Sequence, residues 1–126
     1  MASISNANLS ISCNSTTGIC NCVVSGKVSF TPFELNSQQQ GLQYRLRCQL
    51  IGDDPIDNDT LFLYPLKFFP DATPNLTENF RFEAAVGRNI LNEDPEGGDE
   101  IFAELRLTNP SLSPTLVVKQ TSNVNL

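Results

Sequence analysis

The sequence contains no histidine and no tryptophan, and its eight basic residues are outnumbered by fourteen acidic ones. Without histidine, neither a Ser-His-Asp triad nor a Cys-His pair can form. Without tryptophan, and with most tyrosines and phenylalanines expected on inward faces, the aromatic sugar cleft that a carboxylate-dependent glycosidase needs is disfavoured. The formal net charge of −6 argues against binding to a nucleic-acid backbone, because no basic surplus is available to neutralise phosphates.

Long apolar runs are also missing. No segment approaches the roughly 18 consecutive apolar residues that predict a membrane span. The first residues, Met-Ala-Ser-Ile-Ser-Asn, have neither the basic start nor the apolar stretch of a secretory signal. We therefore expect a cytoplasmic protein, unless an export signal has been removed. The length of 126 residues favours one domain, 1–126.

The strongest pattern is an alternation of apolar and polar residues, which is typical of antiparallel strands with one face on a core. It is clear in segments 20–30, 42–50, 80–86 and 101–107, and weaker in 4–11, 60–69 and 116–121. No segment has a helical period, and the glutamine run 38–40 is expected in a loop. The sequence thus predicts an all-β fold, a single antiparallel β-sandwich of about seven strands, immunoglobulin-like or C2-like.

The four cysteines are Cys13, Cys20, Cys22 and Cys48. Their spacing fits no zinc ribbon or finger, whose ligands come in pairs separated by about two to four residues. Cys20, Cys22 and Cys48 fall on inward strand positions, where free cysteine behaves as a small apolar residue. The alternative is a Cys13–Cys20 or Cys13–Cys22 disulfide across the intervening turn.

Nine of the fourteen acidic residues lie in two segments, 52–59 and 87–100, which contain one basic residue, Arg88. If consecutive strands run in opposite directions, both segments connect strands at the same end of the sandwich. Ca²⁺ takes about six to eight oxygen ligands from flexible loops, so these carboxylates are candidates to share one cation. The candidate ligands are Asp54, Asp57, Asp59, Asp94 and Asp99.

At the level of architecture, these Asp-rich loops resemble those of C2 domains and cadherin-type sandwiches, and the resemblance implies a calcium site. No specific calcium motif is present: the segment that begins at Asn92 has Ala103 where an EF-hand loop needs a glutamate. The alternative is a solvated acidic pole without a cation, since exposed like charges about 4 Å apart interact by only about 1 kcal/mol in water.

Segment 60–69 is apolar on both faces of a strand, and Pro65 makes it irregular or an edge. We expect one of two alternating sets to lie outward and to form an interface with a protein partner or a second copy. The sets are Leu61, Leu63 and Phe69, or Phe62, Tyr64, Leu66 and Phe68. The alternative is that the 38–40 loop or the C-terminal tail covers the outer set.

Together these patterns predict a non-catalytic binding module that recognises a protein partner or self-associates into a homo-oligomer. One alternative is a calcium-dependent binding module that uses segments 52–59 and 87–100, with Ca²⁺ as its cofactor. A second alternative is a carboxylate-dependent hydrolase with a pair of acids from the same pole.

Overall fold

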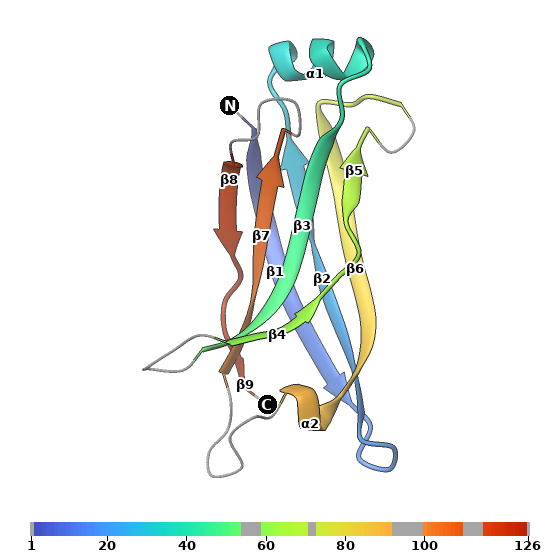
Figure 1. Ribbon diagram of the computed structural model, residues 1–126, viewed down its shortest axis with the longest axis vertical. Helices are drawn as coiled ribbons and strands as arrows, with labels where there is room; N and C mark the ends of the chain where they lie inside the picture. The colour runs from blue at the N-terminus through green and yellow to red at the C-terminus, as the bar shows by residue number, and fades with distance from the viewer. Residues whose placement is uncertain (1, 54–58, 71–72, 92–99, 110–114, 126) are drawn as a thin grey trace.

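The computed structural model describes residues 2–53, 59–70, 73–91, 100–109 and 115–125. Two antiparallel sheets pack face to face (Figure 1). The three-stranded sheet has the order β1 (Ser3–Cys13), β2 (Ile19–Ser29), β6 (Thr77–Gly87). The six-stranded sheet has the order β4 (Asp59–Leu63), β3 (Tyr44–Asp53), β7 (Glu100–Thr108), β8 (Thr115–Gln120), with β5 (Lys67–Phe69) paired to β3 and β9 (Val124–Asn125) paired to β7.

The predicted all-β sandwich is confirmed, and each of the seven predicted segments forms at least one strand. Segment 60–69 divides into β4 and β5 around Pro65, which has no N–H to donate to a ladder. The two-residue strand β9 was not predicted. The immunoglobulin-like or C2-like subtype stays a prediction.

The core lies between the sheets and is made by the inward residues of alternating strands. Cys22 and Val24 of β2 and Leu46 and Leu50 of β3 are completely buried. Their neighbours along each strand face the other way, since successive side chains of a strand point to opposite faces. The alternation seen in the sequence therefore identified the buried face of each long strand.

The expectation of a chain without helices was wrong. Helix α1 (Pro32–Gln39) contains most of the glutamine run that was expected in a loop, and α2 (Arg88–Leu91) follows β6. The buried residues of α1 are Glu34 and Gln38, both polar, so this helix has no apolar stripe to detect. Its start was readable from another signal, the capping box between Thr31 and Glu34.

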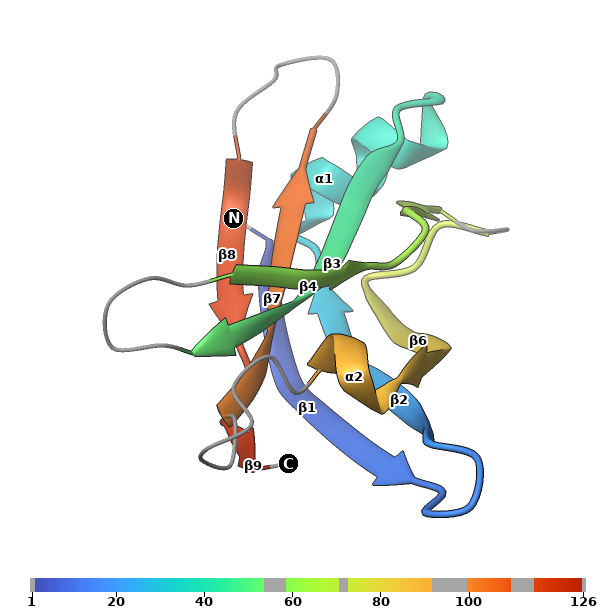
Figure 2. The same ribbon diagram turned by 60° about the horizontal axis from the view of Figure 1, so that its bottom comes forward.

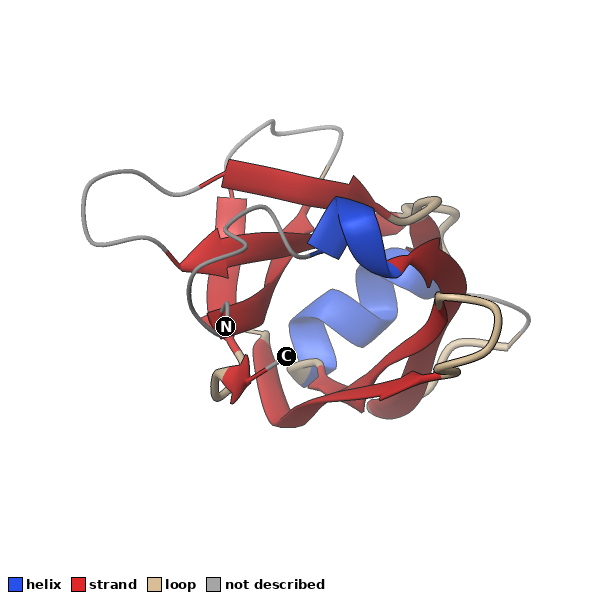
Figure 3. Cartoon of the chain, turned by 90° about the horizontal axis from the view of Figure 1, so that it is seen from below, coloured by secondary structure: helices blue, strands red, loops and turns tan. Residues whose placement is uncertain are grey.

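The capping box also ties the N-terminal strand to the helix. The N–H of Thr31 donates to Glu34 Oε1 at 2.8 Å, and the N–H of Glu34 donates to Thr31 Oγ1 at 3.2 Å. Glu34 Oε2 accepts a hydrogen bond from the N–H of Ala2 at 3.1 Å. Seen along the strands, α1 lies across one end of the sandwich (Figure 3).

The opposite end carries α2 and the β1–β2 turn, which lie side by side (Figure 2). The N–H of Arg88 donates to the carbonyl oxygen of Gly18 in that turn at 2.8 Å. One flank of the sandwich is closed, because β1 contacts β7, β8 and β9. On the other flank, β5 and β6 are edge strands of different sheets.

Candidate functional site

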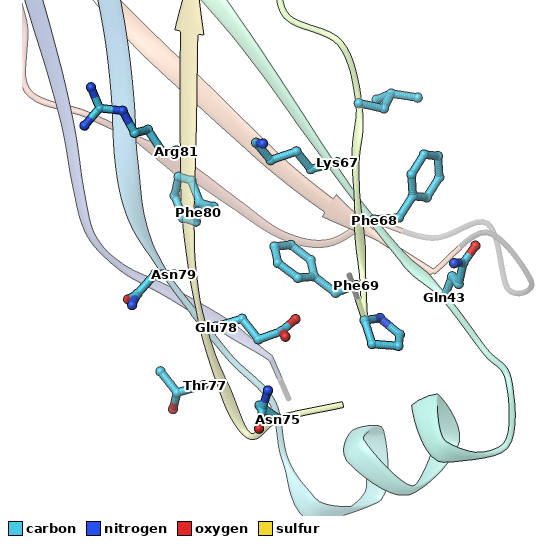
Figure 4. Close-up of a pocket in the computed structure, with 12 residues that line it drawn as sticks. Gln43, Lys67, Phe68, Phe69, Asn75, Thr77, Glu78, Asn79, Phe80 and Arg81 are labelled. Carbon is cyan, nitrogen blue, oxygen red and sulfur yellow. The ribbon is translucent and has the colours of Figure 1, made fainter. Parts of the chain in front are cut away.

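A hollow of about 760 Å³ runs along the open flank between β5 and β6 (Figure 4). Its wall includes two uninterrupted runs, residues 66–70 and residues 77–81, together with Gln43 and Asn75. A pocket on one face of a sheet would be lined by every second residue of a strand. Uninterrupted runs therefore indicate that the hollow follows the edges of β5 and β6.

The hollow combines aromatic and charged side chains. Phe69 and Phe80 are buried, while Lys67 and Glu78 reach into the space between the strands from opposite sides (Figure 4). The Lys67 Nζ atom lies 5.2 Å from the centre of the Phe82 ring, a cation–π distance. Phe68 points away from this space, toward the outer face of the six-stranded sheet (Figure 4).

Three arginines gather on that outer face. Tyr44, Leu46 and Cys48 of β3 are buried, so the alternate residues Arg45 and Arg47 face outward. Arg106 of β7 is the direct cross-strand neighbour of Arg47.

Exposed apolar residues border these arginines. Phe68 is paired with Arg45, Leu63 with Gln49 and Val118 with Arg106. Their side chains are 42%, 51% and 45% exposed, respectively. We call the whole set the arginine face: Arg45, Arg47, Arg106, Leu63, Phe68 and Val118.

The electrostatics of the arginine face are unbalanced. Like charges directly opposite each other on paired strands are unfavourable, and Arg47 is the register partner of Arg106. Glu104 is the neighbouring acid on the described part of this face; its Oε1 accepts from Arg106 at 3.4 Å and from Gln49 at 3.2 Å. Glu104 is one carboxylate against three guanidinium groups, so this part of the face is positive, whereas Asp53 and Glu100 lie at the far end of the same two strands.

The arginines were not predicted as a site, because in the alternating pattern they stood only as polar partners of the inward residues. A usable signal was present, since Arg45, Arg47 and Arg106 all occupy outward positions of the predicted strands 42–50 and 101–107. What the sequence did not provide is the register that places Arg47 opposite Arg106.

The structure divides the predicted interface residues into three groups. Leu63, Leu66 and Phe68 are exposed, and Leu61 and Phe62 are half-buried against the core. The prediction was wrong for Tyr64 and Phe69, which belong to the core. Neither alternating set lies outward as a whole. The strand is interrupted between β4 and β5, around Pro65, and the order of inward and outward positions changes there.

Most of the predicted calcium ligands, Asp54, Asp57, Asp94 and Asp99, lie outside the described residues, and only the main chain of Asp59 is described, in β4. The flanks of the two acidic segments are described. Asp53 is the register partner of Glu100, and Gly52 is the partner of Asp59. Within the described ranges, no group of three or more potential metal ligands occurs.

The cysteines follow the alternative that the sequence left open. Cys13 and Cys20 are register partners on β1 and β2 and form a disulfide, so the expectation of a free Cys20 was wrong. Cys22 and Cys48 are free and buried. Burial raises the pKa of the Cys22 thiol from 9.0 to about 11 and that of Cys48 to about 12, which makes both poor nucleophiles.

Comparison of the chain with family models, with curated proteins and with solved structures gives no match. Among the described residues, neither helix is long and apolar enough to cross a membrane.

Proposed function

We propose that this protein is a non-catalytic binding module whose arginine face binds an acidic segment of a partner protein. The observation that supports the proposal is the placement of Arg45, Arg47 and Arg106 beside exposed Leu63, Phe68 and Val118 on one sheet face. Arginine and aromatic residues are enriched in protein interfaces and among the residues that contribute most to binding energy.

The proposal gives a physical reason for an otherwise unfavourable pairing. Arg47 and Arg106 repel each other in the free protein, and a bound carboxylate would relieve that repulsion. A planar guanidinium group can donate two parallel hydrogen bonds to one carboxylate. The apolar neighbours supply area whose removal from water favours binding.

Peptide selection tests this proposal while the partner is unidentified. Random peptides displayed on phage and selected on the immobilised protein should be enriched in Asp or Glu next to an apolar residue. The double variant Arg47→Glu/Arg106→Glu should lose this enrichment. Lys119→Glu, which makes the same change at one exposed position on β8, is the control and should retain it. Selected peptides without acids, or equal selection by the double variant, would refute the proposal.

The hydrolase alternative stays a prediction. Glycoside hydrolysis needs two carboxylates on either side of the scissile bond. The acids expected to supply them belong to segments 52–59 and 87–100, most of which lies outside the described residues.

A calcium-dependent binding module remains the second candidate. It is favoured by the register that sets Asp53 opposite Glu100 and Gly52 opposite Asp59, which brings the flanks of both acidic segments to the same end of the six-stranded sheet. The test is the thermal melting temperature at millimolar calcium and again with EGTA. A site that binds Ca²⁺ in the folded state alone must raise the melting temperature, and an unchanged value would exclude it.

The cytoplasmic location expected from the sequence stays a prediction, and the Cys13–Cys20 disulfide weighs against it. Disulfides persist in oxidising compartments and are rare in the reducing cytosol. We propose an oxidising compartment for this chain. Alkylation of acid-quenched cells should label two cysteines, Cys22 and Cys48, whereas labelling of all four would support the cytoplasm.

A further inference from the structure

Strand β6 is a long and regular edge strand of the three-stranded sheet. It contains 11 residues without proline, and it pairs with β2 over its whole length without a bulge. In the part of the chain that the structure describes, β2 is its single strand partner. Natural proteins usually protect such an edge with a short strand, proline, a bulge or a covering element, because an open edge recruits further strands.

The neighbouring strand β5 does not provide this protection. It is three residues long and pairs with β3 of the other sheet. The hollow along residues 77–81 leaves the edge of β6 accessible over the first half of the strand. The outward side chains of β6 are exposed along its length: Thr77, Asn79, Arg81, Glu83 and Ala85.

The charged residues along this edge are able to form ion pairs with the same residues of a second copy. Arg81 and Glu83 are the charged members of the outward set, and they lie two positions apart with Phe82 between them. In one chain they form an exposed ion pair with an N–O distance of 2.6 Å. If two β6 strands pair antiparallel about Phe82, the same two charges meet in reciprocal fashion across the edge.

We propose that β6 is a self-association edge at which two copies of this chain form a symmetric dimer, joining their three-stranded sheets into one continuous sheet. Arg81 then lies opposite Glu83 of the partner subunit, and Glu83 lies opposite Arg81 of the partner subunit. Each pair of opposite charges directly across two strands is stabilising. A two-fold axis requires such reciprocal contacts, since the same patch is used on both copies.

Other registers lose this complementarity. An axis through Arg81 sets that cation opposite itself, and an axis through Glu83 does the same for the anion; like charges directly opposite are destabilising. An axis through Phe80 or Ala84 leaves both charges without opposite partners. A slip by one residue would set an outward residue of one copy opposite an inward residue of the other, so the outer faces of the two sheets could not lie on the same side of the joined sheet. The axis at Phe82 keeps Phe80 and Phe82 on the core side of both copies.

Charge exchange between two variants tests the dimer. In the symmetric dimer, positions 81 and 83 meet twice across the axis. Arg81→Glu makes both of these pairs anion against anion, and Glu83→Arg makes both of them cation against cation. The dimer of each variant alone should have a dissociation constant about tenfold higher than that of the wild-type dimer. Light scattering from about 1 µM to about 1 mM measures this constant. In an equimolar mixture, each introduced charge faces an opposite charge of the other variant, so the mixed dimer should regain wild-type affinity. Native mass spectrometry with one variant carrying a tag identifies the mixed species.

The controls separate dimerisation from folding and from the arginine face. Wild-type melting curves for both variants show that they fold, and recovery in the mixture cannot come from misfolded chains. Lys119→Glu and the double variant Arg47→Glu/Arg106→Glu should dimerise as the wild type does, so this test can fail while the proposed acidic-segment binding stands. A wild type that stays monomeric to about 1 mM, or a mixture that does not recover, overturns the proposal.

Discussion

The phenolic oxygen of Tyr64 donates a hydrogen bond to the carbonyl oxygen of Cys22 at 2.9 Å. Tyr64 follows β4 at the edge of the six-stranded sheet, and its own N–H donates to the carbonyl oxygen of Cys48 at 3.0 Å. Cys22 belongs to β2 of the opposite sheet. One residue thus connects both sheets on the flank that is open between β5 and β6.

The first prediction concerns this connection. Tyr64→Phe keeps the ring packed against Phe62 and Phe82, whose centres lie 5.0 Å and 5.5 Å away, but removes the hydrogen bond. The free energy of unfolding in urea should fall by about 1–2 kcal/mol, the usual loss for a buried hydrogen bond. Tyr64→Ala removes the ring packing as well and should lose about 3–5 kcal/mol. Equal stability of Tyr64→Phe and wild type would mean that the Cys22 carbonyl does not need the phenol.

The second prediction concerns Gly26, where β2 passes close to its neighbours. A Cβ atom on Gly26 would lie 2.7 Å from Cζ of Phe80 and 3.0 Å from the carbonyl oxygen of Ser5. Because Phe80 is buried, Gly26→Ala should destabilise the fold by about 1–3 kcal/mol through overpacking. Gly52→Ala is the matched control, since its Cβ would meet Leu61 Cδ1 at 3.5 Å, an ordinary contact. Denaturation curves should leave the control within about 0.5 kcal/mol of wild type; an equal loss in both variants would contradict the steric argument.

The third prediction concerns the buried thiols. In the folded state the pKa of Cys22 is raised from 9.0 to about 11 and that of Cys48 to about 12, because burial disfavours the thiolate. The unfolded chain therefore loses these protons first. This contribution to stability is complete below pH 9 and is lost as the pH rises through the folded-state values.

Melting temperatures measured from neutral pH upward should show this loss above pH 9. The double variant Cys22→Ala/Cys48→Ala should have a shallower decline than wild type, although tyrosine ionisation remains in both proteins. With Ellman's reagent, the native protein should react slowly, and the unfolded, unreduced protein should release two thiols because Cys13 and Cys20 are bridged. Parallel pH profiles for the two proteins would refute the assignment to the thiols.

The interiors of the long strands were predictable from local pattern. Cys22, Leu46 and Leu105 were expected to face inward and are completely buried. Helix α1 was not predictable from the same pattern, because its buried residues Glu34 and Gln38 are polar and leave no apolar period. The division of segment 60–69 was only partly predictable. Pro65 signalled an irregularity, but the sequence did not show that Tyr64 would turn inward toward Cys22.

For the candidate sites, the sequence supplied the chemical groups and the structure supplied their neighbours. By itself the sequence determined the all-β class, the buried face of each long strand and the clustering of acids in two segments. The tertiary structure decided that Arg47 lies opposite Arg106, that Cys13 lies opposite Cys20, and that β6 lies at the edge of the three-stranded sheet. The physical reason is the distance along the chain over which each kind of information extends. Alternation reports the environment of one strand, whereas register and edge position depend on hydrogen bonds between strands that are distant in the chain.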